Sequence, residues 1–263
     1  MKCPFERIVK SSTQCRDGRR WLCYDASVFL PDVAETLHAM TSLLAIDAAT
    51  EACSVALLRD GEIREDFRML PRAHTRYLLP MVDEMLSSAG VTLAQLDGLA
   101  FTAGPGSFTG LRVAIATVQG LAFAADLPVL PVSTLASMAQ HYMNTDQPDE
   151  GSLLMPIIDA RMDELYVGRY VCRNGFVEAV CDDALLAPAA VGDLAAVAVG
   201  LGEGWEYAER FDGAAPARLD TSVLPHAASA LTLAERDYLA GKLLPAEQAQ
   251  PVYLRDSVAW QKA

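Results

Sequence analysis

The sequence predicts an α/β protein built from two similar halves that face each other across a cleft. An apolar strand that ends in an aspartate and is followed by a hairpin occurs at residues 43–67 and again at 153–175. In both halves, a later apolar strand runs into a glycine-rich loop and then a helical pattern, at residues 99–125 and 195–211. A repeated order of elements indicates a duplicated unit, and strands that alternate with helices favour an α/β fold.

The first half begins with a strand over residues 43–47, which ends at Asp47. A turn that contains Thr50 leads to strands over residues 54–58 and 63–67, joined at Asp60 and Gly61. Asp-Gly between two strands is a strong hairpin signal. A carboxylate at the tip of a buried strand can hold a metal-bound phosphate, and it can equally cap its own turn.

A glycine-rich loop follows the strand at residues 99–102 and contains Gly104, Gly106, Ser107 and Gly110. Glycines let the backbone turn sharply and expose N–H groups beside the start of a helix. The loop could therefore seat a phosphate or the backbone of a partner chain, or it could be a tight turn that binds nothing.

Two helices of the first half carry candidate contact surfaces. The helix expected over residues 75–89 has an apolar stripe, which would be either core or interface: Leu78, Met81, Val82 and Met85. The helix expected over residues 111–125 has Ala116, Gly120 and Ala124 at four-residue spacing. Such a ridge allows close approach of another backbone, either the chain's own sheet or a second subunit.

A polar stretch at residues 144–151 suggests a boundary after a strand at 128–132 and a helix at 134–143. The second half then repeats the first, with strands at residues 153–159 and 165–171, a hairpin at Asn174 and Gly175, and a glycine loop at 200–204. A helix over residues 227–239 and a tail close the chain. We predict subdomains at 40–146 and 147–263, in the arrangement of actin, the sugar kinases and Hsp70.

Composition narrows the function classes. The chain has 263 residues, 52% of them apolar, and a net charge of −13. This acidity makes it a poor nucleic-acid binder by itself, because phosphate binding rests on clustered Lys and Arg. No run of eighteen apolar residues and no signal peptide is evident, and the six cysteines include no Cys-x-x-Cys pair. We expect a cytoplasmic protein with reduced thiols and no membrane contact.

Residues 1–39 differ from the rest, with mixed charges and little periodicity. An apolar strand follows soon after Met40, as if the protein began there. We expect Met40 to be the native start and residues 1–39 to be an extension outside the core.

The catalytic parts expected of this architecture are incomplete. An ATPase of this kind needs glycine in its first phosphate loop, where this chain has Ala48 and Ala49, and Glu203 adds negative charge near the second loop. No histidine has another four residues later, and Ser107 lacks the Gly-x-Ser-x-Gly elbow. We predict a degenerate nucleotide site with no catalytic residue and no metal.

Six motifs in order resemble the TsaB (YeaZ) family, a partner in the synthesis of threonylcarbamoyladenosine on tRNA. They cover the chain from Met40 onward: LAIDAATEACSVA (44–56), PRAHTRYLLP (71–80), GPGSFTGLR (104–112), VSTL (132–135), IDARM (158–162) and PVYLRDSVAW (251–260). The resemblance implies an actin-like (ASKHA, ribonuclease H-like) fold. It is similar to the catalytic paralogue TsaD, whose two metal-binding histidines fall here at Thr134 and Met138.

The resemblance further implies a platform without activity of its own. Such a subunit forms a heterodimer with TsaD through the first two helices, recruits the ATPase TsaE, and serves modification at position 37 of tRNAs that read codons beginning with adenine. The implied interface is His74, Leu78, Met81, Val82, Met85, Ala116, Gly120 and Ala124. The vestigial nucleotide loops are Asp47, Thr50, Gly104, Gly106, Ser107 and Gly110.

Further partner and cofactor expectations follow from the same resemblance. We expect a homodimer when the chain is alone, contact with tRNA only through the complex, and no cofactor apart from a possible nucleotide at the joint with the partner. Two other functions stay open: a peptidase that acts on the partner, and an ATP-dependent kinase. The missing nucleophile and base pair argues against the first, and Ala48 and Ala49 against the second.

Overall fold

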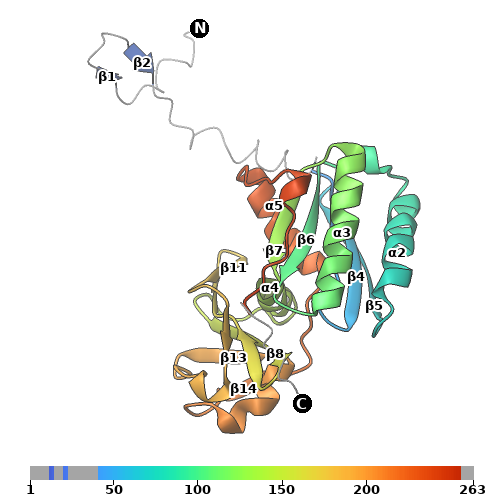
Figure 1. Cartoon of the computed structure of the whole chain (residues 1–263). Helices are drawn as coiled ribbons and strands as arrows, with labels where there is room; N and C mark the ends of the chain where they lie inside the picture. The colour runs from blue at the N-terminus through green and yellow to red at the C-terminus, as the bar shows by residue number, and fades with distance from the viewer. Residues whose placement is uncertain (1–11, 15–19, 23–40, 256–263) are drawn as a thin grey trace.

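A computed structural model describes residues 12–14, 20–22 and 41–255 (Figure 1). The expected start at Met40 and most of the expected extension therefore lie outside the described residues. Within residues 1–39, the structure describes one short antiparallel pair, β1 (Ser12–Gln14) and β2 (Arg20–Leu22).

The first sheet has the strand order β5-β4-β3-β6-β7. Its strands are β3 (Leu43–Asp47), β4 (Ala52–Arg59), β5 (Glu62–Met69), β6 (Gly98–Gly104) and β7 (Val129–Ser133). β4 is antiparallel to both of its neighbours, while β3, β6 and β7 are parallel. The predicted hairpin is confirmed: Asp60 and Gly61 join β4 to β5 with φ of 54° and 75°, as a type I′ turn requires.

The second sheet repeats this order as β11-β10-β8-β13-β14; β9 also pairs with β8, and β12 pairs with β9. Its strands are β8 (Leu153–Arg161), β9 (Glu164–Val167), β10 (Tyr170–Arg173), β11 (Phe176–Ala179), β12 (Ala184–Leu186), β13 (Val197–Leu201) and β14 (Arg218–Asp220). Here too the second strand is antiparallel and the last two are parallel to the first. The duplicated α/β architecture predicted from element order is thus confirmed.

One predicted strand is split in two. Residues 165–171 form β9 and β10, which pair with different parts of β8. The break lies at Gly168, where a Cβ would come within 2.6 Å of the Tyr170 ring. Local sequence pattern cannot show this packing, because both pieces are apolar.

Four α-helices cover the first sheet. α2 (His74–Ala89) and α3 (Phe108–Ala125) pack on one face, and α4 (Thr134–Asp146) and α5 (Ala227–Leu239) on the other (Figure 1). Side chains of β3 alternate between these layers: Leu44 and Ile46 join the core with α2 and α3, whereas Leu43 and Ala45 join the core with α4 and α5. Short 3₁₀ helices lie at Leu93–Gln95, Pro188–Ala190, Glu203–Arg210 and Ala246–Gln248.

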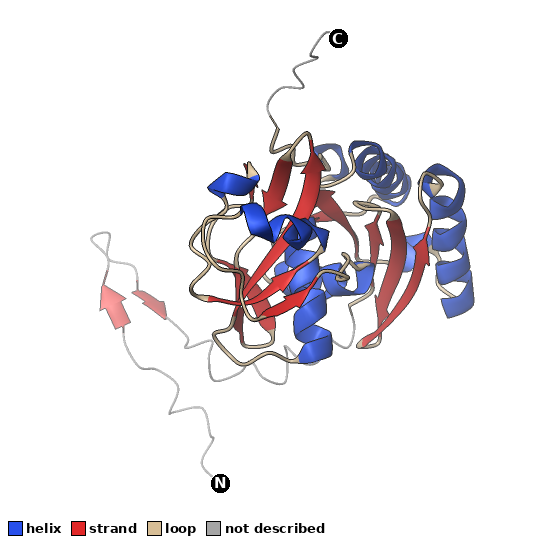
Figure 2. Cartoon of the chain, turned by 90° about the horizontal axis from the view of Figure 1, so that it is seen from below, coloured by secondary structure: helices blue, strands red, loops and turns tan. Residues whose placement is uncertain are grey.

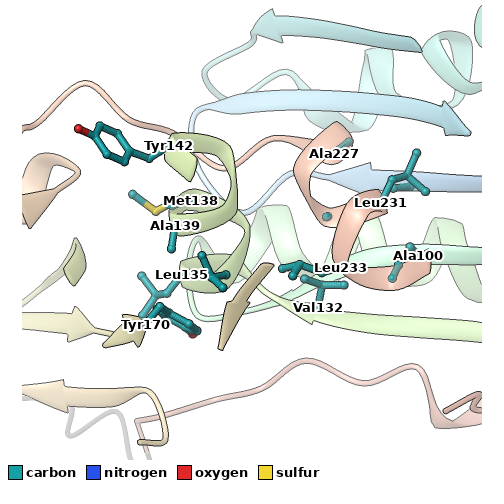
Figure 3. Close-up of a cluster of buried hydrophobic side chains, with 14 of the residues drawn as sticks. Ala100, Val132, Leu135, Met138, Ala139, Tyr142, Tyr170, Ala227, Leu231 and Leu233 are labelled. Atoms are coloured by element: carbon teal, nitrogen blue, oxygen red, sulfur yellow. The ribbon is translucent and has the colours of Figure 1, made fainter. Parts of the chain in front are cut away.

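The predicted division at residues 146 and 147 assigns α5 to the second subdomain. Although α5 follows the second sheet in sequence, it packs against β3, β4, β6 and β7 of the first. α4 contacts strands of both sheets, and the two helices lie between the sheets (Figure 2). Figure 3 shows their shared core, where Met138 and Tyr142 of α4 and Leu231 of α5 belong to one buried cluster.

Among the described residues, no α-helix of the second half matches α3. The helix expected from Trp205 is instead the 3₁₀ helix Glu203–Arg210. Trp205 is 2% exposed, and its indole Nε1 donates to the Met155 carbonyl oxygen at 2.9 Å. One large aromatic side chain therefore helps to fill the layer that two helices fill in the first half.

The expectation that no segment could span a bilayer needs one correction. α3 is long and apolar enough to do so by length and composition, although only 33% of it is buried inside the protein. Leu111, Ala114 and Val118 on its buried face pack on the first sheet, as in a core helix of a folded domain. This packing does not account for the apolar surface of α3 that is exposed to solvent.

Candidate functional site: an interdomain cleft and an exposed helix face

A cleft of about 1170 Å³ lies between the two halves. The first half contributes the turn at residues 49–51 and the loop at 106–110 to its lining. The second half contributes residues 158–161 and Glu203, and the tail contributes 253–255. A protein of this fold class would bind a nucleotide in this cleft, with its phosphates at the predicted phosphate loops.

The predicted phosphate loops lie together, but they pack on each other. Ser107 donates its backbone N–H to the Ala49 carbonyl oxygen at 2.7 Å. A Cβ at Gly106 would collide with that same oxygen, and one at Gly110 would collide with the Ala48 oxygen. The glycines therefore make room for the chain's own backbone. That backbone occupies the position that a phosphate or a partner chain could otherwise take.

The other predicted loop residues have local roles. A Cβ at Gly104 would lie 2.8 Å from the Val252 oxygen, so this glycine lets the tail pass. Ser107 caps α3 by accepting the Gly110 N–H at 3.3 Å, and Thr50 accepts the Ala52 N–H at 3.2 Å. These contacts favour a tight structural turn over a loop that binds a phosphate.

Asp47 is fully buried and takes the turn-capping role. Its Oδ1 accepts hydrogen bonds from the Thr102 hydroxyl at 2.5 Å and the Ala49 N–H at 3.3 Å. Its Oδ2 has no partner. Burial raises the pKa of Asp47 to about 7, although both hydrogen bonds and the nearby His226 act in the opposite direction. A carboxyl that is half protonated at neutral pH and absent from the cleft lining is a poor ligand for a hard cation.

Charge in the second half also disfavours a phosphate. Glu203 lies in the cleft, and its pKa is raised first by burial and then by the neighbouring Asp159, Glu206 and Glu51. These carboxylates would repel the phosphate groups of a nucleotide. Arg161 offsets part of this charge, but it is hydrogen-bonded to Asp159 at 3.0 Å.

The positions implied for metal ligands lie in the core. Thr134 and Met138 are 0% and 1% exposed, and the Thr134 hydroxyl has no hydrogen-bond partner. Within residues 41–255 the structure places no three His, Cys, Asp or Glu side chains together as a metal group. A hydroxyl and a thioether do not fit a site that needs two imidazoles, so no step through a metal is derived.

The sequence motif of the tail did not reveal what the tail contacts. Val252 donates its N–H to the Ala103 oxygen at 2.8 Å, and the Tyr253 hydroxyl accepts from Arg112 Nε at 3.0 Å. Arg255 then reaches the second half, where its Nη2 contacts Glu164 at 2.5 Å and the Ala160 oxygen at 3.2 Å. The tail thus bridges both halves at the cleft, through pairings more than ninety residues apart that no local pattern shows.

Five of the implied interface residues are buried within the single chain. These are His74, Leu78, Met81, Val82 and Met85, all 9% exposed or less. His74 also places its Nε2 at 3.1 Å from the Ala52 oxygen. The stripe packs on β4 because an amphipathic helix buries its apolar face on the nearest apolar surface, which is the chain's own sheet. Core was the alternative to interface, and the structure supports core.

The other three lie on the surface. Ala116, Gly120 and Ala124 are exposed along α3, and no atom comes within 4 Å of a Cβ added at Gly120. Large apolar side chains are also exposed on these two helices, with Leu79 of α2 at 54% and Phe123 of α3 at 66%. The structure leaves this face of α2 and α3 uncovered, and exposed apolar surface of this kind marks interaction sites.

Two tandem ribonuclease H-like halves, with phosphate loops that pack on each other, define a degenerate member of the actin-like class. A family model described as "TsaD: tRNA N6-adenosine threonylcarbamoyltransferase" matches residues 68–234. The curated protein named "tRNA threonylcarbamoyladenosine biosynthesis protein TsaB" of Escherichia coli K12 is 40% identical over 227 residues, which cover 84% of this chain and 97% of that protein. The protein of the same name from Haemophilus influenzae is 40% identical over 231 residues, 84% of this chain and 96% of its own.

Solved structures agree with these relatives. "YeaZ from Pseudomonas aeruginosa" has 45% sequence identity and a TM-score of 0.77, and the match covers 82% of this chain and 100% of that one. Another structure from the same organism, described as similar to peptidase YeaZ, has 46% identity and a TM-score of 0.78 over the same shares. The chain belongs to the TsaB (YeaZ) family, as the six sequence motifs predicted, within the wider group that the TsaD model describes.

Proposed function

We propose that this protein is a non-catalytic platform subunit in the formation of threonylcarbamoyladenosine at position 37 of tRNAs that read codons beginning with adenine. It forms a heterodimer with TsaD and recruits TsaE, and it meets tRNA only through that complex. The family name supports the pathway. The uncovered face of α2 and α3 is the observation that supports a partner role.

The proposed interface consists of Ala116, Gly120 and Ala124 with the exposed Leu79 and Phe123; we call it the α2–α3 face. Small residues let a partner helix approach the α3 backbone closely, and the two large side chains supply apolar contact area at the edges. Two thirds of an apolar helix left unburied would be costly in water without such a partner. The same argument supports self-association of the chain when TsaD is absent.

Cytoplasmic location and the absence of a cofactor of its own complete the proposal. A nucleotide, if one is present, binds at the joint with the partner, because the chain's own phosphate loops are packed against each other. Ser107 caps a helix, and its hydroxyl contacts no basic side chain among residues 41–255, so no specific observation favours a peptidase.

The test combines reconstitution with one substitution. Modification of tRNA by TsaD, TsaE and the adenylate-forming enzyme should require this chain, and this chain alone should show no turnover. Gly120→Leu should abolish binding to TsaD in calorimetry, because its side chain would fill the space that a partner backbone needs. The monomer should still fold, since nothing lies within 4 Å of the added Cβ.

Ala189→Leu, an exposed substitution on the second half, is the matched control and should bind normally. Normal binding by Gly120→Leu would reject the proposed interface. Full tRNA modification in the absence of this chain would reject the platform role itself.

A further inference from the structure

Three stacked rings lie where the two halves meet. The Phe67 ring of β5 stacks on the His226 imidazole, with centroids 4.3 Å apart and planes 13° apart. The His141 imidazole of α4 also stacks on the His226 imidazole, with centroids 3.8 Å apart and planes 4° apart. Because His226 immediately precedes α5, the stack connects one strand of the first sheet to both helices that lie between the sheets.

One carboxylate serves both the stack and the start of α5. Glu65 of β5 places its Oε2 2.8 Å from Nδ1 of His226, and its Oε1 accepts the Ala228 N–H at 3.0 Å. Burial opposes ionisation of Glu65, yet the hydrogen bonds from His226 and Ala228 lower its pKa overall. Glu65 is therefore ionised at neutral pH, and it matches one positive charge on the ring that it contacts.

Further hydrogen bonds hold the start of α5 in place. The Ser54 hydroxyl oxygen accepts the Ala227 N–H at 2.9 Å. The Ser137 hydroxyl of α4 donates to the His226 carbonyl oxygen at 2.9 Å and accepts the His226 N–H at 3.2 Å. At this point the chain crosses from the second sheet back to the first. Movement of the His226 ring would therefore disturb the attachment of α5 at its first turn.

The two stacked imidazoles can carry one proton between them, but not one proton each. Parallel rings 3.8 Å apart cannot hydrogen-bond to each other, so two protonated rings would repel each other directly. Burial, and after it the charge on His226, lowers the pKa of His141. Glu65 is already engaged by His226 and the backbone of α5.

Other acidic groups near the stack do not remove this repulsion. Asp146 at the end of α4 and Asp220 of β14 act on His141 from a distance. Asp146 is already paired with Arg218 at 2.6 Å. Asp47 of β3 interacts with His226 through its charge, but it is half protonated near neutral pH.

We propose that the stacked imidazoles of His141 and His226, together with Glu65, form a proton-operated latch at the start of α5, where the chain returns from the second sheet to the first. With one proton or none on the pair, the rings stack and Glu65 holds the start of α5. A second proton, placed on His141, separates the rings and releases the first turn of α5. The folded chain thus senses acidification at the joint that sets how the two halves are held.

Amide hydrogen exchange in the full chain tests the latch, because it measures how well the first turn of α5 is protected from solvent. The protection factors of Ala227 and Ala228 should fall at least tenfold between pH 7.5 and pH 5.5, after correction for the intrinsic rate. His141→Phe keeps a ring in the stack but cannot take the proton, so its protection factors should stay constant over this range. Exchange is preferred to global unfolding because the titration of Asp47 affects overall stability in the opposite direction.

Ring titration by NMR gives a second, independent readout. The His141 signal should titrate at a lower pH than an ordinary histidine side chain, because burial and the charge on His226 lower its pKa. In His226→Gln the His141 midpoint should rise, because the neighbouring charge is gone. Equal loss of amide protection in His141→Phe and the unchanged chain, or a His141 midpoint unaffected by His226→Gln, would overturn the proposal.

Discussion

At the scale of single residues, glycines that look alike in sequence have different roles. Gly106 and Gly110 leave room for the backbone of the turn at residues 48–49, and Gly104 for the tail. Gly120 lies in the middle of a helix with open space around it, so packing within the folded chain does not require a glycine there. A single substitution in each class separates these roles.

Gly110→Ala should lower the free energy of unfolding by about 2 kcal/mol or more, because its Cβ collides with the Ala48 carbonyl oxygen. Gly120→Ala should raise it by roughly 0.5–1 kcal/mol, since alanine loses less backbone entropy in a helix. Urea denaturation of both variants beside the unchanged protein measures the two values. A destabilised Gly120→Ala would show that the surroundings of Gly120 are not open.

The buried Asp47 predicts a pH dependence with a definite sign. Its pKa is about 7 in the folded chain, above the ordinary value of 3.8 for an aspartate, so the folded state holds the proton over that interval. The stability from this proton is fully present below pH 3.8 and is lost as the pH rises through 7. Asp47→Asn should therefore be more stable than the unchanged protein at pH 8, by about 1–3 kcal/mol, and the gain should shrink toward pH 5. Thermal unfolding at both values tests this, and an equal change at both would contradict the assigned burial effect.

At the scale of elements, a capping side chain fixes where α4 begins. Ser133 begins α4 by accepting the Leu135 and Ala136 N–H groups at 3.1 and 3.2 Å. Its hydroxyl also donates to Asp183 at 2.5 Å, and Asp183 accepts from Tyr170 at 2.6 Å. One serine therefore caps the helix and ties it to the second sheet.

Ser133→Ala should lower the free energy of unfolding by about 1–3 kcal/mol, because it removes the cap and leaves the half-buried Asp183 with one partner fewer. Ser133→Thr keeps the hydroxyl and should recover most of the loss. Chemical denaturation compares the three proteins. Equal losses in the alanine and threonine variants would mean that packing, not the hydroxyl, is what matters there.

At the scale of the whole molecule, the two halves are held together by α4, α5 and the tail. The helices form a shared core between the sheets, and Arg255 joins the tail to the β8–β9 turn. The guanidinium is mostly buried, with an 18% exposed side chain, so its contacts are less screened than those of a surface pair.

Arg255→Ala should release the tail from the second half without unfolding either sheet. Exchange of the Val252 amide, which is bonded to the Ala103 oxygen, should become faster, while amides in the middle of β3 and β8 stay protected. Arg255→Lys keeps the charge but cannot reproduce the several contacts, so it should give an intermediate rate. Unchanged Val252 protection in Arg255→Ala would show that the tail is held by its contacts with the first half alone.

The sequence by itself determined the duplicated order of elements, both Gly-containing hairpins, the helix stripes and the family. These follow from spacing within short windows, such as Leu43 to Asp47 or Asn174 and Gly175. Only the tertiary structure decided that α5 joins the first sheet, that Met81 and Met85 are core while Gly120 is surface, and that the glycine loop seats its own backbone. Those outcomes depend on contacts between residues far apart in the chain, because a residue's burial is set by what packs on it and not by its neighbours in sequence.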